Sequence, residues 1–444
     1  MINKRELELL GNALVKLDEG TSELPDFAPA FDAERAGEVL MEVAARMQDN
    51  YPYFHPQYAG QMLKPPHPIA RMAYALSLWV NPNNHALDGG RASSAMEKEC
   101  IVELGRLFGW DKPLGHLAGG GTMANLEALW VAGRLNPGKK VIASAQAHYT
   151  HSRITEVLGI SFAGVPVDRH GRMDVAATES LLAAGDVGTV VVTMGNTGLG
   201  AVDPLADILA LRERYDFRIH ADAAYGGYFG LASELEDEPR RHFDRLSEVD
   251  SIVIDPHKHG LQPYGCGCIL FRDSSVGTLY KHDSPYTYFS SGDMHLGEIT
   301  LECSRPGASA VALWATHRLL PPIPGGEFAD GLDSCLRAAR MLWLDLHNSS
   351  AFTPMMEPEL DIVVYAVNAE TTSAASARAR EVFDKAAQRE LHLALFELPS
   401  DLFAAYAPDI AINSETVTCL RSTLMKPEHE AWVERLTALL EASA

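Results

Sequence analysis

Short apolar segments alternate with amphipathic ones over the middle of the chain, from about residue 115 to residue 272. Within Thr122–Gly133, for example, Leu126, Leu129 and Trp130 recur at helical spacing and share one face. Strands that are apolar on both sides and joined by helices predict an α/β fold, a largely parallel sheet with helices on both faces. The predicted strands are Val141–Ala145, Thr189–Met194, Arg218–Asp222, Ser251–Asp255 and Gly267–Phe271.

The two ends of the chain follow different patterns. Residues 1–50 predict two helices, the second with Val39, Val43 and Met47 in one row, and a stretch rich in proline and aromatic residues follows that cannot be regular helix. After the break PPIPGG, helices alternate with strand-like segments, which predicts a smaller α+β domain. We therefore predict an N-terminal helical arm (1–55), a large domain (56–320) and a small C-terminal domain (321–444).

Composition and charge narrow the classes of function. The chain has 444 residues, with 37 Lys and Arg against 59 Asp and Glu, and its net charge of -22 disfavours binding to nucleic acid or to anionic membrane surfaces. Its apolar runs are far shorter than the roughly 20 residues that a membrane span needs. Because the cysteines are sparse and scattered and no secretory leader is visible at the start, we expect a cytoplasmic protein with reduced thiols.

Polar features follow several predicted strands, at the edge where open α/β sheets bind ligands. The glycine run that ends in Gly121 and Thr122 leads into a helix, whose free N–H groups can bind an anion; a flexible turn capped by Thr122 is the alternative. The run lacks the Lys-Ser or Lys-Thr ending of a P-loop. Asp222 ends a strand, where a buried carboxylate needs a cation, unless it only caps the next turn.

Lys258 and a pair of histidines complete the set. Lys258 lies in a turn after a predicted strand, where an amine can form a Schiff base with a carbonyl group; a solvated surface lysine is the alternative. His148 and His151 lack further metal ligands nearby, so we expect no metal and interpret the pair as a stacking ring or as structural histidines. An anion cradle, a stacking ring, a buried carboxylate and a strand-end lysine are the contacts that pyridoxal phosphate requires.

The order of these motifs resembles that of the pyridoxal-phosphate-dependent group II amino-acid decarboxylases. The resemblance runs from about Tyr53 to Pro321 and includes NPNNHAL, GGGTMAN, AHYTHSRITEVLGI, HADAAYGG, IDPHKHGLQPYGCG and WATHRLLP. The pieces NPNN, PHKxGxxPY and WAxHxxLP are most similar to bacterial tyrosine decarboxylases and their archaeal relatives, although this chain is much shorter than the bacterial enzymes. The resemblance implies fold type I, the aspartate-aminotransferase-like architecture, with a mainly parallel large domain and a smaller α+β domain.

The resemblance also implies roles for individual residues. Lys258 would form the Schiff base with the cofactor, Asp222 would pair with the pyridine nitrogen, and His148 would stack on the ring. Tyr264 would protonate the product carbon, and a tyrosine of the following loop, Tyr286 or Tyr288, is the alternative donor. The remaining cofactor contacts that it implies are Gly121, Thr122, Thr197, Ala224 and His257.

The implied reaction is decarboxylation of an L-amino acid, an aromatic one such as tyrosine being favoured, to the amine and carbon dioxide through the Lys258 Schiff base and a quinonoid. A carbon–carbon lyase of the sphingosine-phosphate-lyase type, an aminotransferase and a non-catalytic binding protein are the alternatives on the same fold. A homodimer with sites at the interface is implied as well, with Ser304 or Arg305 reaching across. Arg305 could instead bind a phosphate or a carboxylate, or pair with an acid, and Tyr58 and His85 are weaker pocket candidates.

Overall fold

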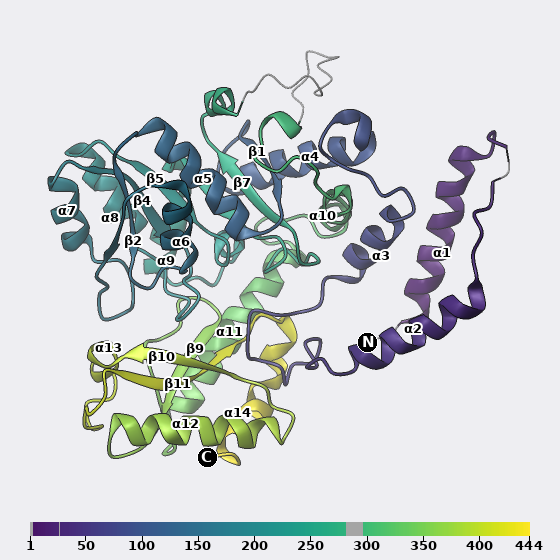
Figure 1. The fold of residues 1–444 in the computed structure, drawn as a ribbon. Helices are drawn as coiled ribbons and strands as arrows, with labels where there is room; N and C mark the ends of the chain where they lie inside the picture. Colours follow the sequence, from purple (N-terminus) through teal and green to yellow (C-terminus); the bar gives the residue numbers. More distant parts are fainter. Residues whose placement is uncertain (1–2, 26, 281–295) are drawn as a thin grey trace.

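The computed structural model describes residues 3–25, 27–280 and 296–444, and its two β-sheets are each packed among helices (Figure 1). The strands of the large sheet are β1 (Leu114–Ala118), β2 (Lys140–Ser144), β3 (Phe162–Val165), β4 (Val187–Thr193), β5 (Arg218–Asp222), β6 (Ser251–Ile254) and β7 (Gly267–Phe271). They lie in the order β1-β7-β6-β5-β4-β2-β3. Neighbours from β3 through β6 are parallel, whereas β7 runs antiparallel to both β6 and β1.

The predicted α/β fold class is confirmed. Strands β5 and β7 have the predicted bounds, and β4 begins two residues before the predicted start because Val187 pairs with Lys140 of β2, across an irregularity in the register at Gly188. The apolar pattern missed β3, which has four residues, one of them exposed and two half-buried, and β1, in which the polar His116 interrupts the apolar run.

Helices cover the large sheet on both faces, since every residue of the central strand β4 is buried. Helix α5 follows the glycine loop after β1, and α10 begins at Gly307 in a run of small residues. The helices of this part are α3 (Pro68–Ser77), α4 (Arg91–Leu107), α5 (Gly121–Leu135), α6 (Thr150–Leu158), α7 (Val175–Ala183), α8 (Leu205–Ala210), α9 (Asp237–Phe243) and α10 (Gly307–Leu319).

A second, antiparallel sheet lies in the C-terminal part, with the order β10-β11-β9-β8. Its elements are α11 (Glu327–His347), β8 (Phe352–Pro354), β9 (Ile362–Val367), α12 (Thr372–Ala387), β10 (Ala394–Pro399), α13 (Ser400–Ala404), β11 (Thr416–Thr423) and α14 (Val433–Glu441). Figure 1 shows α11, α12 and α14 packed around this sheet. The domain boundaries at residues 55 and 320 stay a prediction.

The N-terminal helices α1 (Lys4–Asp18) and α2 (Ala33–Met47) lie at one side of the molecule, where α1 contacts α3 (Figure 1). Neither contains a buried residue, and an ion pair of 2.8 Å between Glu6 and Arg71 connects α1 to α3. The proline-rich segment 51–67 forms neither helix nor strand; through Ala59 it exchanges backbone hydrogen bonds with the small-sheet part of the chain. In the described part of the chain, no helix is long and apolar enough to cross a membrane.

Candidate active site

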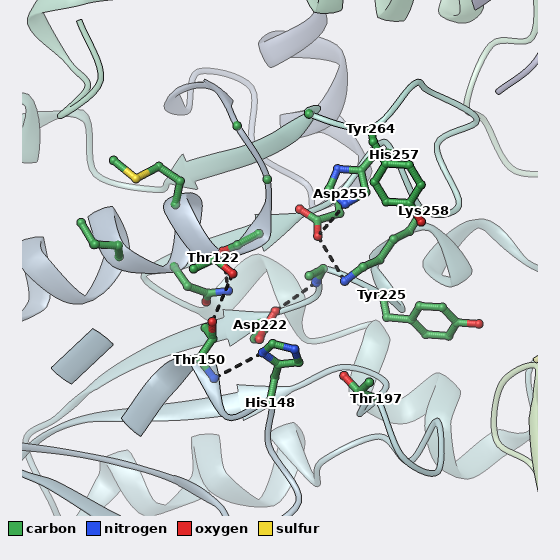
Figure 2. Close-up of a pocket in the computed structure, with 18 of the residues that line it drawn as sticks. Thr122, His148, Thr150, Thr197, Asp222, Tyr225, Asp255, His257, Lys258 and Tyr264 are labelled. Carbon is green, nitrogen blue, oxygen red and sulfur yellow. Dashed lines mark hydrogen bonds and ion pairs between the residues drawn. The ribbon is translucent and has the colours of Figure 1, made fainter. Parts of the chain in front are cut away.

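A cavity of about 560 Å³ opens at the carboxyl ends of the parallel strands (Figure 2). Parallel strands bring their carboxyl ends to one edge of the sheet, so residues that are far apart in the chain meet there. Each of the nine residues predicted for the site lines this cavity: Gly121, Thr122, His148, Thr197, Asp222, Ala224, His257, Lys258 and Tyr264.

The glycine loop between β1 and α5 forms one wall of the cavity. Gly120 has a φ of 145°, which side-chain-bearing residues rarely adopt, and a Cβ atom on Gly121 would lie 2.6 Å from Oδ2 of Asp255. The loop therefore presents bare backbone N–H groups at a helix N-terminus, the arrangement that binds anions. The Gly119 N–H already donates to a carboxylate oxygen of Glu302 at 3.2 Å, so an acidic group is accepted at this position.

Thr122 and His257 flank the loop. The Thr122 hydroxyl lies 3.1 Å from the hydroxyl of Thr150, and Nδ1 of His257 lies 2.9 Å from the backbone oxygen of Cys266. Burial lowers the pKa of His257, so its ring is neutral near pH 7. Both side chains are thus fixed by protein contacts beside the loop, and together they fit a phosphate group.

Asp222, the last residue of β5, is paired with a histidine. Its Oδ2 lies 2.8 Å from Nε2 of His151, which is fully buried, and its Oδ1 accepts the N–H of Ala224 at 3.2 Å. Burial by itself raises the pKa of Asp222, but the hydrogen bond from His151 and the positive charge of Lys258 outweigh it and hold the pKa well below its usual value. Asp222 is therefore a permanent buried anion that can hold a cation in the cavity.

Lys258 extends from the turn after β6 into the cavity (Figure 2). Its Nζ lies 3.1 Å from Oδ2 of Asp255, and the same oxygen lies 3.5 Å from Nε2 of His257. The other oxygen of this buried carboxylate, Oδ1, has no hydrogen-bond partner among the described residues. Asp255 thus holds the free amine and retains capacity for one more donor.

His148 and Tyr264 border the open part of the cavity. Burial lowers the pKa of His148, so its flat ring is neutral and can stack on a planar ligand. The Tyr264 hydroxyl donates to the backbone oxygen of Met62 at 2.6 Å, and its ring lies 4.8 Å from that of His257. Burial raises the pKa of Tyr264 to about 12, so the phenol keeps its proton over the whole physiological range.

Sequence reasoning missed four polar side chains near the cavity. His151 was treated only as a possible metal ligand or a structural residue, although its spacing of three from His148 places both rings near the end of β2. Asp255 was within a quoted motif, whereas Glu302 had no signal. Arg421 of β11 donates to the backbone oxygen of Thr197 at 2.8 Å and to Gln61 at 2.7 Å, and its distance along the chain hid this contact.

Other candidates lie elsewhere. Arg305 forms a buried ion pair of 2.6 Å with Glu97 and is not among the described residues that line the cavity. Nor are Tyr58, His85 and Ser304. The loop tyrosines Tyr286 and Tyr288 lie outside the described residues.

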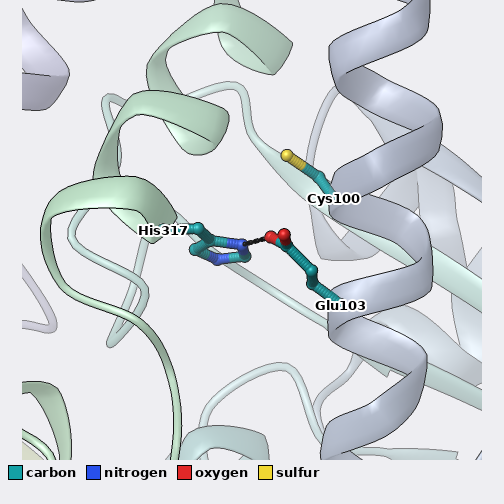
Figure 3. Close-up of side chains that lie close together, drawn as sticks. All are labelled: Cys100, Glu103 and His317. Carbon is teal, nitrogen blue, oxygen red and sulfur yellow. Dashed lines mark hydrogen bonds and ion pairs between the residues drawn. The ribbon is translucent and has the colours of Figure 1, made fainter.

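A group of possible metal ligands lies away from the cavity, between α4 and α10 (Figure 3). Ligand atoms of Cys100, Glu103 and His317 lie within 4.8 Å of one another. Glu103 is already paired, with Nδ1 of His317 at 2.8 Å and with Arg318 at 2.6 Å, and burial raises the pKa of the Cys100 thiol well above its usual value. We interpret the group as an ion-pair network that joins the two helices.

Comparison with known proteins points to one family. The model of the pyridoxal-dependent decarboxylase conserved domain matches residues 130–368. A probable L-tyrosine/L-aspartate decarboxylase of Methanothermobacter thermautotrophicus is 31% identical over 69% of this chain and 82% of that protein. An L-tyrosine decarboxylase of Enterococcus faecium is 28% identical over 69% of this chain, which spans 66% of that longer protein. The crystal structure of mouse CSAD superposes with a TM-score of 0.80 at 19% identity over 98% of both chains.

Proposed function

Because the chain belongs to the pyridoxal-dependent decarboxylase family, whose members are carboxy-lyases that use pyridoxal phosphate, we propose that it decarboxylates an L-amino acid with an uncharged side chain, tyrosine being favoured. The observation that supports this assignment is the convergence of Lys258, Asp222, His148 and the glycine loop on one cavity. When bound, the cofactor supplies an aldehyde that condenses with amines and a ring that accepts the electrons of the bond that breaks.

The residues of the cavity fit the parts of this cofactor. The loop N–H groups, Thr122 and His257 would hold its phosphate, and Lys258 would reach its aldehyde carbon. The Asp222 anion would keep a proton on the pyridine nitrogen, because a buried negative charge stabilises the neighbouring positive one. His148 would cover one face of the ring, which positions the substrate and excludes water from that side.

Charge around the cavity supports a substrate with an uncharged side chain. Three carboxylates line it, those of Asp222, Asp255 and Glu302, whereas Lys258 is the one Lys or Arg among the described lining residues. The side-chain carboxylate of aspartate would need a second cation, and Arg305 is engaged by a buried glutamate. An aromatic side chain needs only space and apolar contact, and a volume of about 560 Å³ is sufficient.

Tyr264 is the proposed donor of the proton that replaces the carboxylate. Its phenol donates a hydrogen bond to the Met62 oxygen at the rim of the cavity. Because the phenol keeps its proton near pH 7, it can donate that proton directly once its side chain turns toward the cavity. Tyr286 and Tyr288 are the alternative donors.

The test is amine and carbon dioxide formation from tyrosine, phenylalanine, tryptophan, aspartate and glutamate. We expect tyrosine to exceed aspartate by at least about tenfold in kcat/KM, which is ~1.4 kcal/mol of discrimination. Lys258→Ala should lack both turnover and the cofactor absorbance near ~420 nm. Aspartate as the faster substrate would refute the assignment of side-chain class, and loss of the amino acid without carbon dioxide would refute decarboxylation in favour of a lyase or an aminotransferase.

We also propose that the chain forms a homodimer through α1 and α2. Neither helix contains a fully buried residue, and Leu40 and Met41 of α2 are 62% and 68% exposed. Phe27 and Phe31, in the connection between the two helices, are exposed even more. Apolar side chains gathered in this way are typical of a surface that a partner covers. Leu40→Asp should shift sedimentation from dimer to monomer, whereas the matched change Glu38→Gln should not; a monomeric wild type would contradict the proposal.

A further inference from the structure

A second cavity, of about 500 Å³, lies on the other side of the turn that carries Lys258. It is bordered by segment 54–68, by His259 and Leu261 of that turn, by the start of α11 and by residues 426–428. None of the residues that line it lines the catalytic cavity. The two spaces are therefore separate, and the second is not required by the proposed decarboxylation.

Two lysines lie at the inner end of the second cavity. Lys426 is only 4% exposed; its Nζ donates to the backbone oxygen of Tyr58 at 2.6 Å and lies 5.3 Å from the centre of the Tyr58 ring. Nζ of Lys64 donates to the backbone oxygen of Met425 at 3.0 Å. In residues 3–25, 27–280 and 296–444, neither ammonium has a carboxylate within 4.0 Å. The carboxylates that act on the two ammonium groups lie beyond this distance: Asp361 and Glu428 act on Lys64, and Glu428 acts on Lys426. An anion bound between the two lysines would lie closer to them than these carboxylates and would be stabilised.

The pKa values of both lysines are lowered. Burial lowers the pKa of Lys64, and burial together with the neighbouring charge of Lys64 lowers the pKa of Lys426 to about 7. Lys426 is thus on the edge of losing its proton, and a bound carboxylate would restore it.

The mouth of the cavity has the opposite charge. Glu327, Asp330 and Glu428 line it and are exposed, whereas the lysines are further in. A simple anion has to pass these carboxylates, but a molecule with a carboxylate at one end and an ammonium at the other is attracted at both. The walls between the charged ends are apolar and include Phe54 and Phe328 among the side chains that line them.

We propose that this cavity binds the zwitterion of an amino acid with an apolar side chain, its carboxylate toward Lys64 and Lys426 and its ammonium toward the carboxylates of the mouth. The site is not the catalytic one, because the proposed reaction occurs at Lys258. Its wall nevertheless includes His259, the neighbour of Lys258, and segment 54–68 also accepts the hydrogen bond of Tyr264 through Met62. A bound amino acid would therefore contact the two segments that hold the catalytic lysine and the proposed proton donor.

The test is calorimetric titration with L-leucine, in parallel with 4-methylpentanoate, which lacks its ammonium, and 3-methylbutylamine, which lacks its carboxylate. The full chain is used both loaded with pyridoxal phosphate and freed of it, so that binding is measured apart from any reaction at Lys258. We expect leucine to bind at least tenfold more tightly than either half-molecule in both forms. Equal binding of 4-methylpentanoate, or leucine binding only to the loaded form, would overturn the proposal.

Two variants test whether leucine binds in the second cavity. Lys64→Met should weaken leucine binding at least tenfold, whereas the control Lys112→Met, at an exposed lysine outside both cavities, should leave it unchanged. Glu428→Gln, an exposed change that does not threaten folding, should weaken leucine binding and leave 4-methylpentanoate binding equal or tighter. Leucine binding that is unchanged in both Lys64→Met and Glu428→Gln refutes the site, and Glu428→Gln alone decides the matter if Lys64→Met does not fold.

Discussion

The buried pair of Asp222 and His151 allows a quantitative test of the site's electrostatics. Both side chains are nearly inaccessible, and Nε2 of His151 lies 2.8 Å from Oδ2 of Asp222. Replacing His151 by Phe fills a similar volume but leaves a buried carboxylate with only the Ala224 N–H and the charge of Lys258 as support. Removing one partner of a buried pair costs about 3–5 kcal/mol, so we expect His151→Phe to destabilise the protein by that order.

A double-mutant cycle with Asp222→Asn isolates the part of this destabilisation that comes from the interaction between His151 and Asp222. A hydrogen bond to a charged group contributes about 1.5–3 kcal/mol, and this is the coupling expected at pH 7. The sign of this coupling follows from burial. Asp222→Asn should destabilise the wild type, but it should destabilise the His151→Phe variant much less, or even stabilise it. The reason is that a neutral amide tolerates burial better than an unpaired carboxylate. The assay is urea unfolding of the cofactor-free chain, with cofactor affinity and kcat measured on the same four proteins.

The pH dependence provides a second check on the pair. The folded pKa of Asp222 is depressed, so its stabilisation is complete above the unfolded value of about 4 and is lost as pH falls through the folded pKa. The stabilisation that comes from the Asp222 charge should therefore be fully present at pH 5 and above. A coupling within about 0.5 kcal/mol of zero at pH 7 would refute the role given to His151, because independent sites add to within that margin.

Three further outcomes are expected at neighbouring positions. Tyr264→Phe should lower kcat by at least about 100-fold while cofactor affinity changes less than about threefold, and a kcat close to wild type would assign the proton to another donor. Gly121→Ala should weaken cofactor binding about tenfold or more in a fluorescence titration, because its Cβ would lie 2.6 Å from Asp255, whereas Gly37→Ala in open space should not. Burial lowers the pKa of His220 to about 3, so as the pH falls below about 6.5 the unfolded chain gains a proton at this residue that the folded chain does not. His220 should therefore remove about 1.4 kcal/mol of stability per pH unit, in addition to the effect of other buried histidines such as His429, whose pKa is also lowered to about 3. His220→Gln should reduce the slope measured by urea unfolding by that amount, and an unchanged slope would contradict this assignment.

The candidate site was predictable because each of its main residues follows or ends a strand. Asp222 ends β5, and Lys258 comes four residues after the end of β6. Parallel strands place such positions along one edge, so a correct strand prediction already brings them together. The strand β1 was not predicted, although the glycine loop that follows it was. Three consecutive glycines make the loop recognisable, whereas the sequence LGHLA of β1 has no continuous apolar run.

Partners of these residues were not predictable in the same way. His151 points at Asp222 from helix α6, and Arg421 reaches Thr197 from the other sheet, over a separation of 224 residues. Such contacts depend on how two elements pack and on the rotamers that packing selects, and neither is encoded by a local pattern.

Arg305 was a candidate in the sequence, but its partner could not be predicted. A lone arginine in a glycine- and proline-containing turn gave no local sign of whether its partner was a ligand or the protein. The fold supplies Glu97 from α4 at 2.6 Å and the backbone oxygen of Leu117, the residue before the end of β1, at 2.7 Å. A buried guanidinium must be satisfied by acceptors that do not depend on a ligand being present, or the empty site would be strongly destabilised. The guanidinium therefore ties β1, the strand that precedes the glycine loop, to α4, and in this way supports the position of that loop.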